Sequence, residues 1–256
     1  MIDPRAIIDP GARIAENVSI GPFSIIGPNV QIGAGTRVGP HVVINGPTHI
    51  GRDNQFFQFA SIGEIPQDKK YRGEDTLLEI GDRNVVRECV TMHRGTVQGG
   101  GVTRLGNDNL IMANVHIAHD CIVGNHTIFA NNASLAGHVI VDDFVILGGY
   151  SLVHQFCAIG THSFSAAASL ITKDVPPFVL VSGHMAKPYG LNVEGMRRRG
   201  FAAHTVRALR QAYKLIYRAN LPLGRAIEEL RAMASDCPEV GAMADFIERS
   251  QRGIVR

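Results

Sequence analysis

Four histidines lie close together in the middle of the chain: His116, His119, His138 and His154. An imidazole changes its charge near neutral pH, so a histidine is suited to take the proton of a reacting hydroxyl group. Asp120 follows His119 directly, and carboxylates orient the catalytic histidines of many enzymes. Because adjacent residues often face apart, the sequence leaves open whether Asp120 reaches His119 to orient it or to stabilise its imidazolium form.

A repeat of six residues organises the same region. From Leu105 to Ile159 every sixth residue is apolar: Leu105, Ile111, Ile117, Val123, Phe129, Leu135, Val141, Leu147, Val153 and Ile159. No helix or ordinary strand has this period, but a chain that turns a corner every six residues does. Three such sides make a triangular coil of about eighteen residues, and the large aliphatic residue of each side points inward.

This repeat gives His119 a partner one coil away. Gly137 lies eighteen positions after His119, so the two residues should stack at the spacing of paired strands, about 5 Å. A glycine at that position leaves room beside the imidazole and keeps its own N–H available.

The six-residue register already begins at Ile2 and is broken twice, near residues 64–78 and 94–104. Surface loops of this kind are inexpensive in loop-closure entropy, but insertions in solenoids also gather where ligands bind. The polar residues Gln67, Asp68 and Lys70 favour the functional interpretation for the first insertion. Later, Ser165 is a polar exception in the register, and Ile171 restores it.

We therefore predict a mainly β protein, with a parallel β-helix over residues 1–187 and a C-terminal helical domain over residues 188–256. The helical domain should cover the open end of the last coil. Apolar residues at helical spacing predict three helices: His204–Arg218, Leu223–Ala234 and Val240–Ser250.

Composition narrows the class of protein. The formal net charge is +2 and the only dense basic run is Arg197–Arg199, so nucleic acid is not an expected partner. The N-terminus lacks the apolar core of a signal peptide, and no long apolar run suggests a membrane span, so we expect a cytoplasmic protein. The four cysteines form no CxxC pair; Cys121 and Cys157 fall at inward positions, which favours buried free thiols over a metal site or disulfides.

Several longer strings resemble one family of hexapeptide-repeat enzymes, the UDP-N-acetylglucosamine O-acyltransferases. The matching strings are His93-Arg94-Gly95-Thr96, His116-Ile117-Ala118-His119-Asp120, Asn131-Asn132, Leu135-Ala136-Gly137-His138, Val153-His154-Gln155-Phe156, Asp174-Val175-Pro176-Pro177, Asn192-Val193-Glu194-Gly195 and Arg198-Arg199-Gly200. The resemblance covers essentially the whole chain. It implies a left-handed parallel β-helix that assembles as a homotrimer with sites between subunits. It also implies transfer of an (R)-3-hydroxyacyl group from acyl carrier protein to the 3-hydroxyl of UDP-N-acetylglucosamine, the first step of lipid A synthesis, without a cofactor or metal.

The resemblance also assigns roles to individual residues. His119 is the expected general base, and the Gly137 amide is the expected oxyanion donor. The expected substrate contacts are His116, His138 and His154, Asp68 with Gln67 and Lys70, and, for the nucleotide, Asn192, Glu194 and Arg198. Ala167 and Met185 correspond to positions that measure the acyl chain in the family; long-chain members have Gly at the first of them and short-chain members have Met.

Three alternatives remain open at this point. The related N-acyltransferase acting on the 3-O-acylated product usually carries an extra N-terminal domain, whereas the repeat here starts at Ile2. A γ-class carbonic anhydrase would use three histidines to bind zinc in a trimeric β-helix. A non-catalytic β-helix scaffold would need neither the His119–Gly137 stack nor a polar first insertion.

Overall fold

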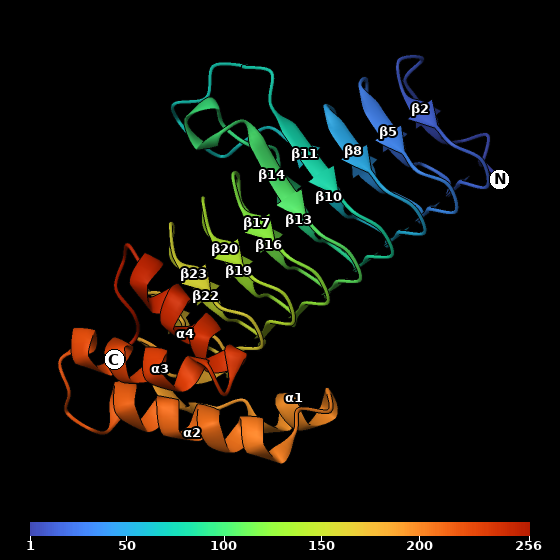
Figure 1. The fold of residues 1–256 in the computed structure, drawn as a ribbon. Helices are drawn as coiled ribbons and strands as arrows, with labels where there is room; N and C mark the ends of the chain where they lie inside the picture. Colours follow the sequence, from blue (N-terminus) through green and yellow to red (C-terminus); the bar gives the residue numbers. More distant parts are fainter.

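The computed structural model describes all 256 residues and shows a three-sided β-helix followed by a group of helices (Figure 1). Almost every turn of the chain adds one short strand to each of three parallel sheets. The first sheet consists of β1 (Ile7–Ile8), β4 (Ile25–Ile26), β7 (Val43–Ile44), β10 (Ser61–Glu64), β13 (Thr91–His93), β16 (His116–Ile117), β19 (Ser134–Leu135), β22 (Leu152–Val153) and β25 (Leu170–Ile171).

The other two sheets have the same construction. The second sheet consists of β2 (Arg13–Ile14), β5 (Val30–Ile32), β8 (Thr48–Ile50), β11 (Leu77–Ile80), β14 (Val102–Leu105), β17 (Ile122–Val123), β20 (Ile140–Val141) and β23 (Ala158–Ile159). The third sheet consists of β3 (Ser19–Ile20), β6 (Arg37–Val38), β9 (Gln55–Phe56), β12 (Val85–Val86), β15 (Leu110–Ile111), β18 (Ile128–Phe129), β21 (Ile146–Leu147), β24 (Phe164–Ser165), β26 (Val179–Ser182) and β27 (Lys187–Leu191).

The register of the sheets follows the predicted coil length. Ile7 pairs with Ile25 and His116 pairs with Ser134, so the coils contain eighteen residues where no insertion intervenes. Only the last coil is shorter, because Phe164 pairs with Leu180. The apolar residue of each side points inward, and Ile117 and Leu135 are 1 % and 0 % exposed. Ser165 is buried at such a position because its hydroxyl bonds to that of Ser151 at 2.7 Å, which satisfies the polar group inside the prism.

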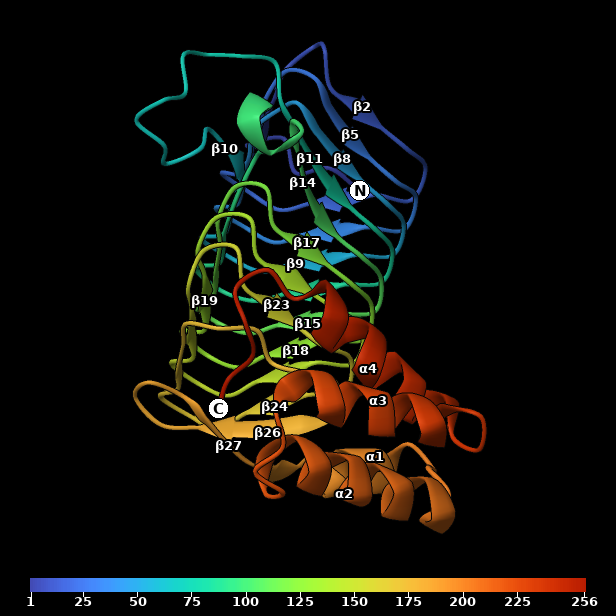
Figure 2. The same cartoon turned by 60° about the vertical axis from the view of Figure 1, so that its left-hand side comes forward.

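The chain between successive strands lies at the three corners of the prism. The first corner joins the first sheet to the second, the second corner joins the second sheet to the third, and the third corner joins the third sheet to the first. Both interruptions of the repeat leave from the first corner. The first insertion lies between β10 and β11, and the second lies between β13 and β14 and contains the short 3₁₀ helix η1 (Val97–Gly99). They lie side by side above the later coils (Figure 2).

The C-terminal region closes one end of the prism. It contains α1 (Val193–Arg198), α2 (Ala203–Tyr217), α3 (Leu223–Ala234) and α4 (Pro238–Arg249). The three predicted helices correspond to α2–α4, whereas α1 was not predicted as a helix of its own. The predicted division at residue 188 falls inside β27, which pairs antiparallel with β26 as the last strand of the third sheet.

The helices and the last coils share one continuous apolar core. Asp174 ties the two parts together, because its side chain accepts hydrogen bonds from Ala158 N and from the hydroxyl of Ser250. Cys121 and Cys157 are buried free thiols, as predicted. No helix is both long enough and apolar enough to span a membrane.

Candidate active site

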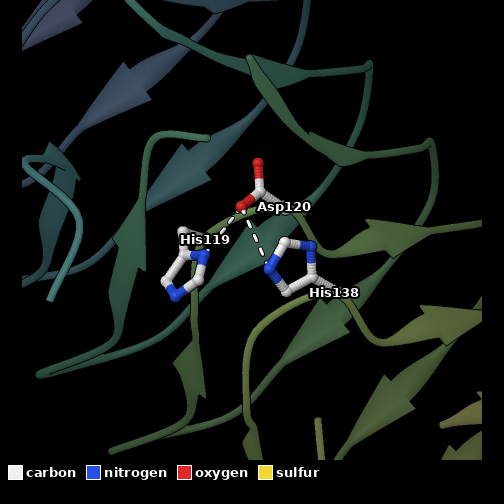
Figure 3. A group of neighbouring side chains, drawn as sticks. All are labelled: His119, Asp120 and His138. Atoms are coloured by element: carbon white, nitrogen blue, oxygen red, sulfur yellow. Dashed lines mark hydrogen bonds and ion pairs between the residues drawn. The ribbon is translucent and has the colours of Figure 1, made fainter. Parts of the chain in front are cut away.

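The first corner brings His119, Asp120 and His138 together in adjacent coils (Figure 3). Nδ1 of His119 lies 2.7 Å from Oδ2 of Asp120, and Nε2 of His138 lies 3.6 Å from the same oxygen. The Asp120 side chain is almost completely buried, whereas 15 % of the His119 side chain and 22 % of the His138 side chain are exposed. Both imidazoles are therefore accessible from one side and fixed by the carboxylate from the other.

The turn between β16 and β17 explains why neighbouring residues share this site. Asp120 has a φ of 61°, in the left-handed region, whereas successive side chains point to opposite faces only in an extended strand. The turn therefore lets the Asp120 carboxylate fold back to His119. This geometry answers the question that the sequence left open, because Asp120 contacts His119 directly.

Asp120 is held by the second insertion as well as by His119. Its Oδ1 accepts a hydrogen bond from the Thr96 N–H at 2.7 Å, and its Oδ2 accepts one from the Thr96 hydroxyl at 2.6 Å. Burial opposes ionisation of this carboxyl group, but the hydrogen bonds from His119 and Thr96 together outweigh it and keep the pKa of Asp120 below its usual value. An ionised carboxylate only accepts hydrogen bonds, so Nδ1 of His119 is the donor, and in the neutral imidazole Nε2 is the nitrogen that accepts a proton.

Gly137 lies against the His119 ring, as the eighteen-residue spacing predicted. A β-carbon built on Gly137 would be only 2.6 Å from Cε1 and 2.9 Å from Nε2 of His119. The Gly137 N–H donates no hydrogen bond within the protein, while the N–H of the next residue, His138, donates to the carbonyl of His119. The residue that stacks on the His119 ring therefore has a main-chain N–H without a partner in the protein.

The first insertion contributes charge to this corner. Burial lowers the pKa of His138, and the carboxylates of Asp120 and Asp68 oppose that shift. Asp68 therefore lies within electrostatic reach of His138, and its Oδ1 caps the turn of its loop by accepting the Lys70 N–H at 2.9 Å. Gln67 and the Lys70 side chain are exposed and have no side-chain partner in the protein.

His116 lies on the same side of the protein as these histidines, but burial shields its imidazole from water. Its Nδ1 is 2.8 Å from the Thr91 hydroxyl, and its ring meets that of His93 edge-on at 5.2 Å. Burial, and then the nearby His93 and His119, lower the pKa of His116 to about 4, so this imidazole is neutral at physiological pH.

Two residues of this region were not predicted as site residues. His93 is 4 % exposed and its Nδ1 has no hydrogen-bond partner; Thr96 holds Asp120. Both belong to the string His93-Arg94-Gly95-Thr96, which marked the family resemblance without indicating their individual contacts. Spacing gives no signal for Thr96, because it reaches Asp120 from an insertion outside the repeat.

The remaining predicted residues lie farther along the same chain. His154 is at the first corner but exposed, with Nδ1 3.2 Å from its neighbour's carbonyl oxygen. Asn192 is tied to the second corner by a hydrogen bond to the His162 carbonyl, and it caps α1, which carries Glu194 and Arg198. The exposed Arg198 guanidinium pairs with Glu194 at 2.9 Å.

Both residues predicted to measure the acyl chain lie at the third corner. Ala167 follows β24 and is exposed. Met185, 55 % exposed, lies in the turn before β27, which the Ala186 N–H fastens to the Leu170 carbonyl at 2.7 Å. One chain therefore does not bring Ala167 and Met185, or Asn192, Glu194 and Arg198, next to His119.

The same cluster also contains side chains of the types that bind metal ions. Nitrogen or oxygen donors of His119, Asp120 and His138 lie within 4.8 Å of one another. However, Oδ2 of Asp120 already accepts hydrogen bonds from the Thr96 hydroxyl and from His119, and a metal would have to displace them. The donor set thus fits a carboxylate hydrogen-bonded to His119 and Thr96 better than a metal centre, and the absence of a metal stays a prediction.

Comparison with known proteins shows which family the chain belongs to. The model of the second domain of UDP-N-acetylglucosamine O-acyltransferase matches residues 174–255, and the hexapeptide-repeat model of bacterial transferases matches residues 11–46 and 103–137. The solved LpxA of Acinetobacter baumannii is 53 % identical over all of this chain and 99 % of that one, with a TM-score of 0.98. This chain belongs to the UDP-N-acetylglucosamine acyltransferase family.

Other members of the acyltransferase family agree with this assignment. The UDP-N-acetylglucosamine O-acyltransferase of Moraxella catarrhalis is 52 % identical over 100 % of this chain and 99 % of that one, with a TM-score of 0.98. The Francisella novicida enzyme is 43 % identical over 100 % and 94 % of the two chains, with the same TM-score. The predicted left-handed β-helix and the predicted acyltransferase family are both confirmed, so the carbonic anhydrase and scaffold alternatives lose their support.

Proposed function

We propose that this acyltransferase transfers an (R)-3-hydroxyacyl group from acyl carrier protein to the 3-hydroxyl of UDP-N-acetylglucosamine. Family membership supports the reaction class and the sugar nucleotide. The observation that carries the mechanism is the position of the His119 ring, which has Asp120 at its Nδ1 and Gly137 beside its Nε2.

A group of this site is available for each step of the reaction. Nε2 of His119 removes the proton of the sugar hydroxyl while that oxygen attacks the thioester carbonyl carbon. The carbonyl oxygen gains negative charge, and the free Gly137 N–H is available to donate a hydrogen bond to it. When the tetrahedral intermediate collapses, the carbon–sulfur bond breaks and the imidazolium returns its proton to the leaving sulfur. The Asp120 carboxylate stabilises the imidazolium between these two proton transfers.

The distribution of the other predicted residues supports a site shared between chains. The base is at the first corner, the nucleotide residues are at the second and the chain-measuring residues are at the third, so a substrate in contact with all three sets needs at least two subunits. We propose a homotrimer in which the first corner of one subunit faces the second and third corners of its neighbour.

The carrier protein needs a docking surface of its own. Helix α2 and its C-cap carry Arg207, Arg210, Lys214 and Arg218, and the helix contains no acidic residue. A basic helix of this kind attracts an acidic partner electrostatically, which supports docking of acyl carrier protein there. Arg210→Glu should then raise the KM for the acyl carrier protein and leave the KM for the sugar nucleotide unchanged.

His119→Ala tests the mechanism. Acyl transfer should fall by roughly 100-fold or more, the loss expected for a general base, while circular dichroism and the oligomeric state remain those of the wild type. Near-normal turnover of the variant would refute the assignment of the base.

Mixed oligomers test the shared site. In a trimer that contains both His119→Ala and Arg198→Ala subunits, some interfaces have an intact His119 facing an intact Arg198. At low sugar nucleotide concentration, the co-expressed mixture should therefore be more active than either variant alone. A mixture no more active than the average of the two variants would mean that each subunit holds a complete site.

A further inference from the structure

The second insertion, residues 94–104, packs directly on the carboxylate that orients His119. Thr96 is 1 % exposed and donates two hydrogen bonds to Asp120, one from its N–H and one from its hydroxyl. Thr103, at the other end of the insertion, is 0 % exposed and accepts the Asp120 N–H at 2.7 Å through its hydroxyl oxygen. The insertion thus binds the side chain and the main chain of Asp120.

The direction of the Thr96 hydroxyl is fixed as well as its position. The Gly99 N–H lies 3.3 Å from the Thr96 oxygen and donates to it. Since a hydroxyl group has a single proton, that proton is directed to Oδ2 of Asp120, the oxygen that also receives Nδ1–H of His119.

Gly99 shows how closely the insertion covers this group. A β-carbon built on Gly99 would overlap the Asp120 carboxylate carbon and both its oxygens. The main chain of η1 therefore lies over the carboxylate with no room for a side chain, which keeps water from replacing the Thr96 donors.

These contacts fix the protonation pattern of the base. A carboxylate oxygen that receives the Thr96 proton and the Nδ1 proton is held in one orientation, and it accepts but does not donate. If the Thr96 hydroxyl were missing, the Asp120 carboxylate would be free to rotate away from His119. The imidazole would then be free to adopt the other tautomer, in which Nε2 carries the proton. In that tautomer Nε2 is unable to act as a base.

We propose that Thr96 is a positioning residue for acyl transfer, acting through Asp120 to hold His119 in the tautomer with Nε2 unprotonated. This assigns a role to the second insertion, and it rests on the proposed function of His119 as the base. Thr96 itself touches no substrate.

Thr96→Val removes the hydroxyl with little change in shape and keeps the main-chain donor. Loss of one hydrogen bond to a charged group should lower kcat by roughly 10- to 100-fold, with the KM for UDP-N-acetylglucosamine within about twofold of the wild type because no substrate contact is lost. Thr96→Ser, which restores the hydroxyl, should recover most of kcat. Thr127→Val is the matched control, since Thr127 is equally buried and its hydroxyl donates to Asn109 within the prism; its kcat should be that of the wild type.

A second measurement does not depend on activity. In protein with ¹⁵N-labelled histidine at pH 8, the His119 signal should show Nδ1 protonated and Nε2 unprotonated in the wild type and Thr96→Ser, and a mixture of tautomers in Thr96→Val. The proposal is overturned if Thr96→Val keeps the wild-type kcat, if Thr96→Ser is as impaired as Thr96→Val, or if His119 of the folded wild type carries its proton on Nε2. Should the wild type transfer no acyl group at all, the proposed function fails, while the tautomer spectra still test the contact with Thr96.

Discussion

Gly137 and the His119 ring are in direct contact across two coils, so closely that a methyl group on Gly137 would lie 2.6 Å from the imidazole. Gly137 is not among the residues with positive φ, so alanine is acceptable to the backbone at this position. Glycine is needed here because the His119 imidazole occupies the space that a side chain would fill.

Gly137→Ala should therefore lower kcat by roughly 100-fold, the effect of displacing a catalytic group by about 1 Å, even though the N–H is retained. Gly11→Ala is the control, because Gly11 lies in a first-corner turn where the nearest atom to a new β-carbon is an Asp9 carboxylate oxygen at 3.2 Å. Steady-state kinetics of both variants, with thermal unfolding to show that they are folded, would check this. Equal activity of Gly137→Ala and Gly11→Ala would contradict it.

Two adjacent arginines on α1 give a sharper test of nucleotide binding. Arg197 and Arg198 are both 76 % exposed and both pair with Glu194, but only Arg198 is expected to contact the diphosphate, through its fixed fork of donors. Arg198→Ala should raise the KM for UDP-N-acetylglucosamine by roughly tenfold or more with kcat almost unchanged, because such contacts bind ground and transition state alike. Arg197→Ala should change neither constant. A large fall in kcat at constant KM would place Arg198 in the chemistry instead.

Ala167 predicts a particular response to acyl length. Alanine adds one methyl group relative to the glycine of long-chain members, so we expect a preference at or slightly below the longest chains, with tolerance of neighbouring lengths. Since each buried CH₂ is worth about 0.8 kcal/mol, discrimination between adjacent lengths is only several-fold.

Ala167→Met should shift the preference toward chains shorter by several carbons, because the added side chain would fill the end of the groove. Competition between hydroxyacyl carrier proteins of different length measures this, with the KM for the sugar nucleotide as the internal control. A variant that retains the parent preference would mean that Ala167 does not line the groove.

Stability should decrease in mild acid, and His162 provides a way to test the cause. Burial between Phe144 and Phe178, with a further contribution from Arg199, lowers its pKa to about 4, although Asp143 opposes the shift. The unfolded chain, in which this pKa is near 6.5, binds more protons between these two values. The stabilisation is therefore complete above pH 6.5 and is lost as the pH falls toward 4.

His162→Phe keeps the stack of rings but removes the titrating group. At one fixed protein concentration, the melting temperature of the wild type should fall more between pH 7.5 and pH 5 than that of the variant. Parallel decreases would show that other groups control the acid response.

The sequence predicted the features that depend on the repeat. The inward apolar residue of each side, the eighteen-residue stack of Gly137 on His119 and the two interruptions all follow from counting along the chain. Counting along the chain did not predict the contacts that depend on the path of a turn or an insertion. The contact of Asp120 with His119 requires a left-handed φ at Asp120, and the contact with Thr96 requires the path of an insertion that no period describes.

Resemblance to a family supplied a different kind of information. It pointed to Asn192, Glu194, Arg198, Ala167 and Met185, which are far from His119 within one chain and which no reasoning from spacing would have joined to it. Whether these residues complete the site of a neighbouring subunit is a property of the assembly, and the mixed-oligomer experiment addresses it.

The eighteen-residue register also has a consequence for how the chain acquires its structure. Each strand pairs only with the coils directly before and after it, for example His116 with Thr91 and with Ser134, so closing one coil requires only a short loop of chain. Folding is then able to advance one coil at a time, as in other solenoids. We expect the coils that contain His119 and Gly137 to form while the ribosome is still synthesising α2–α4, so that the catalytic pair is assembled before the end of the prism is closed.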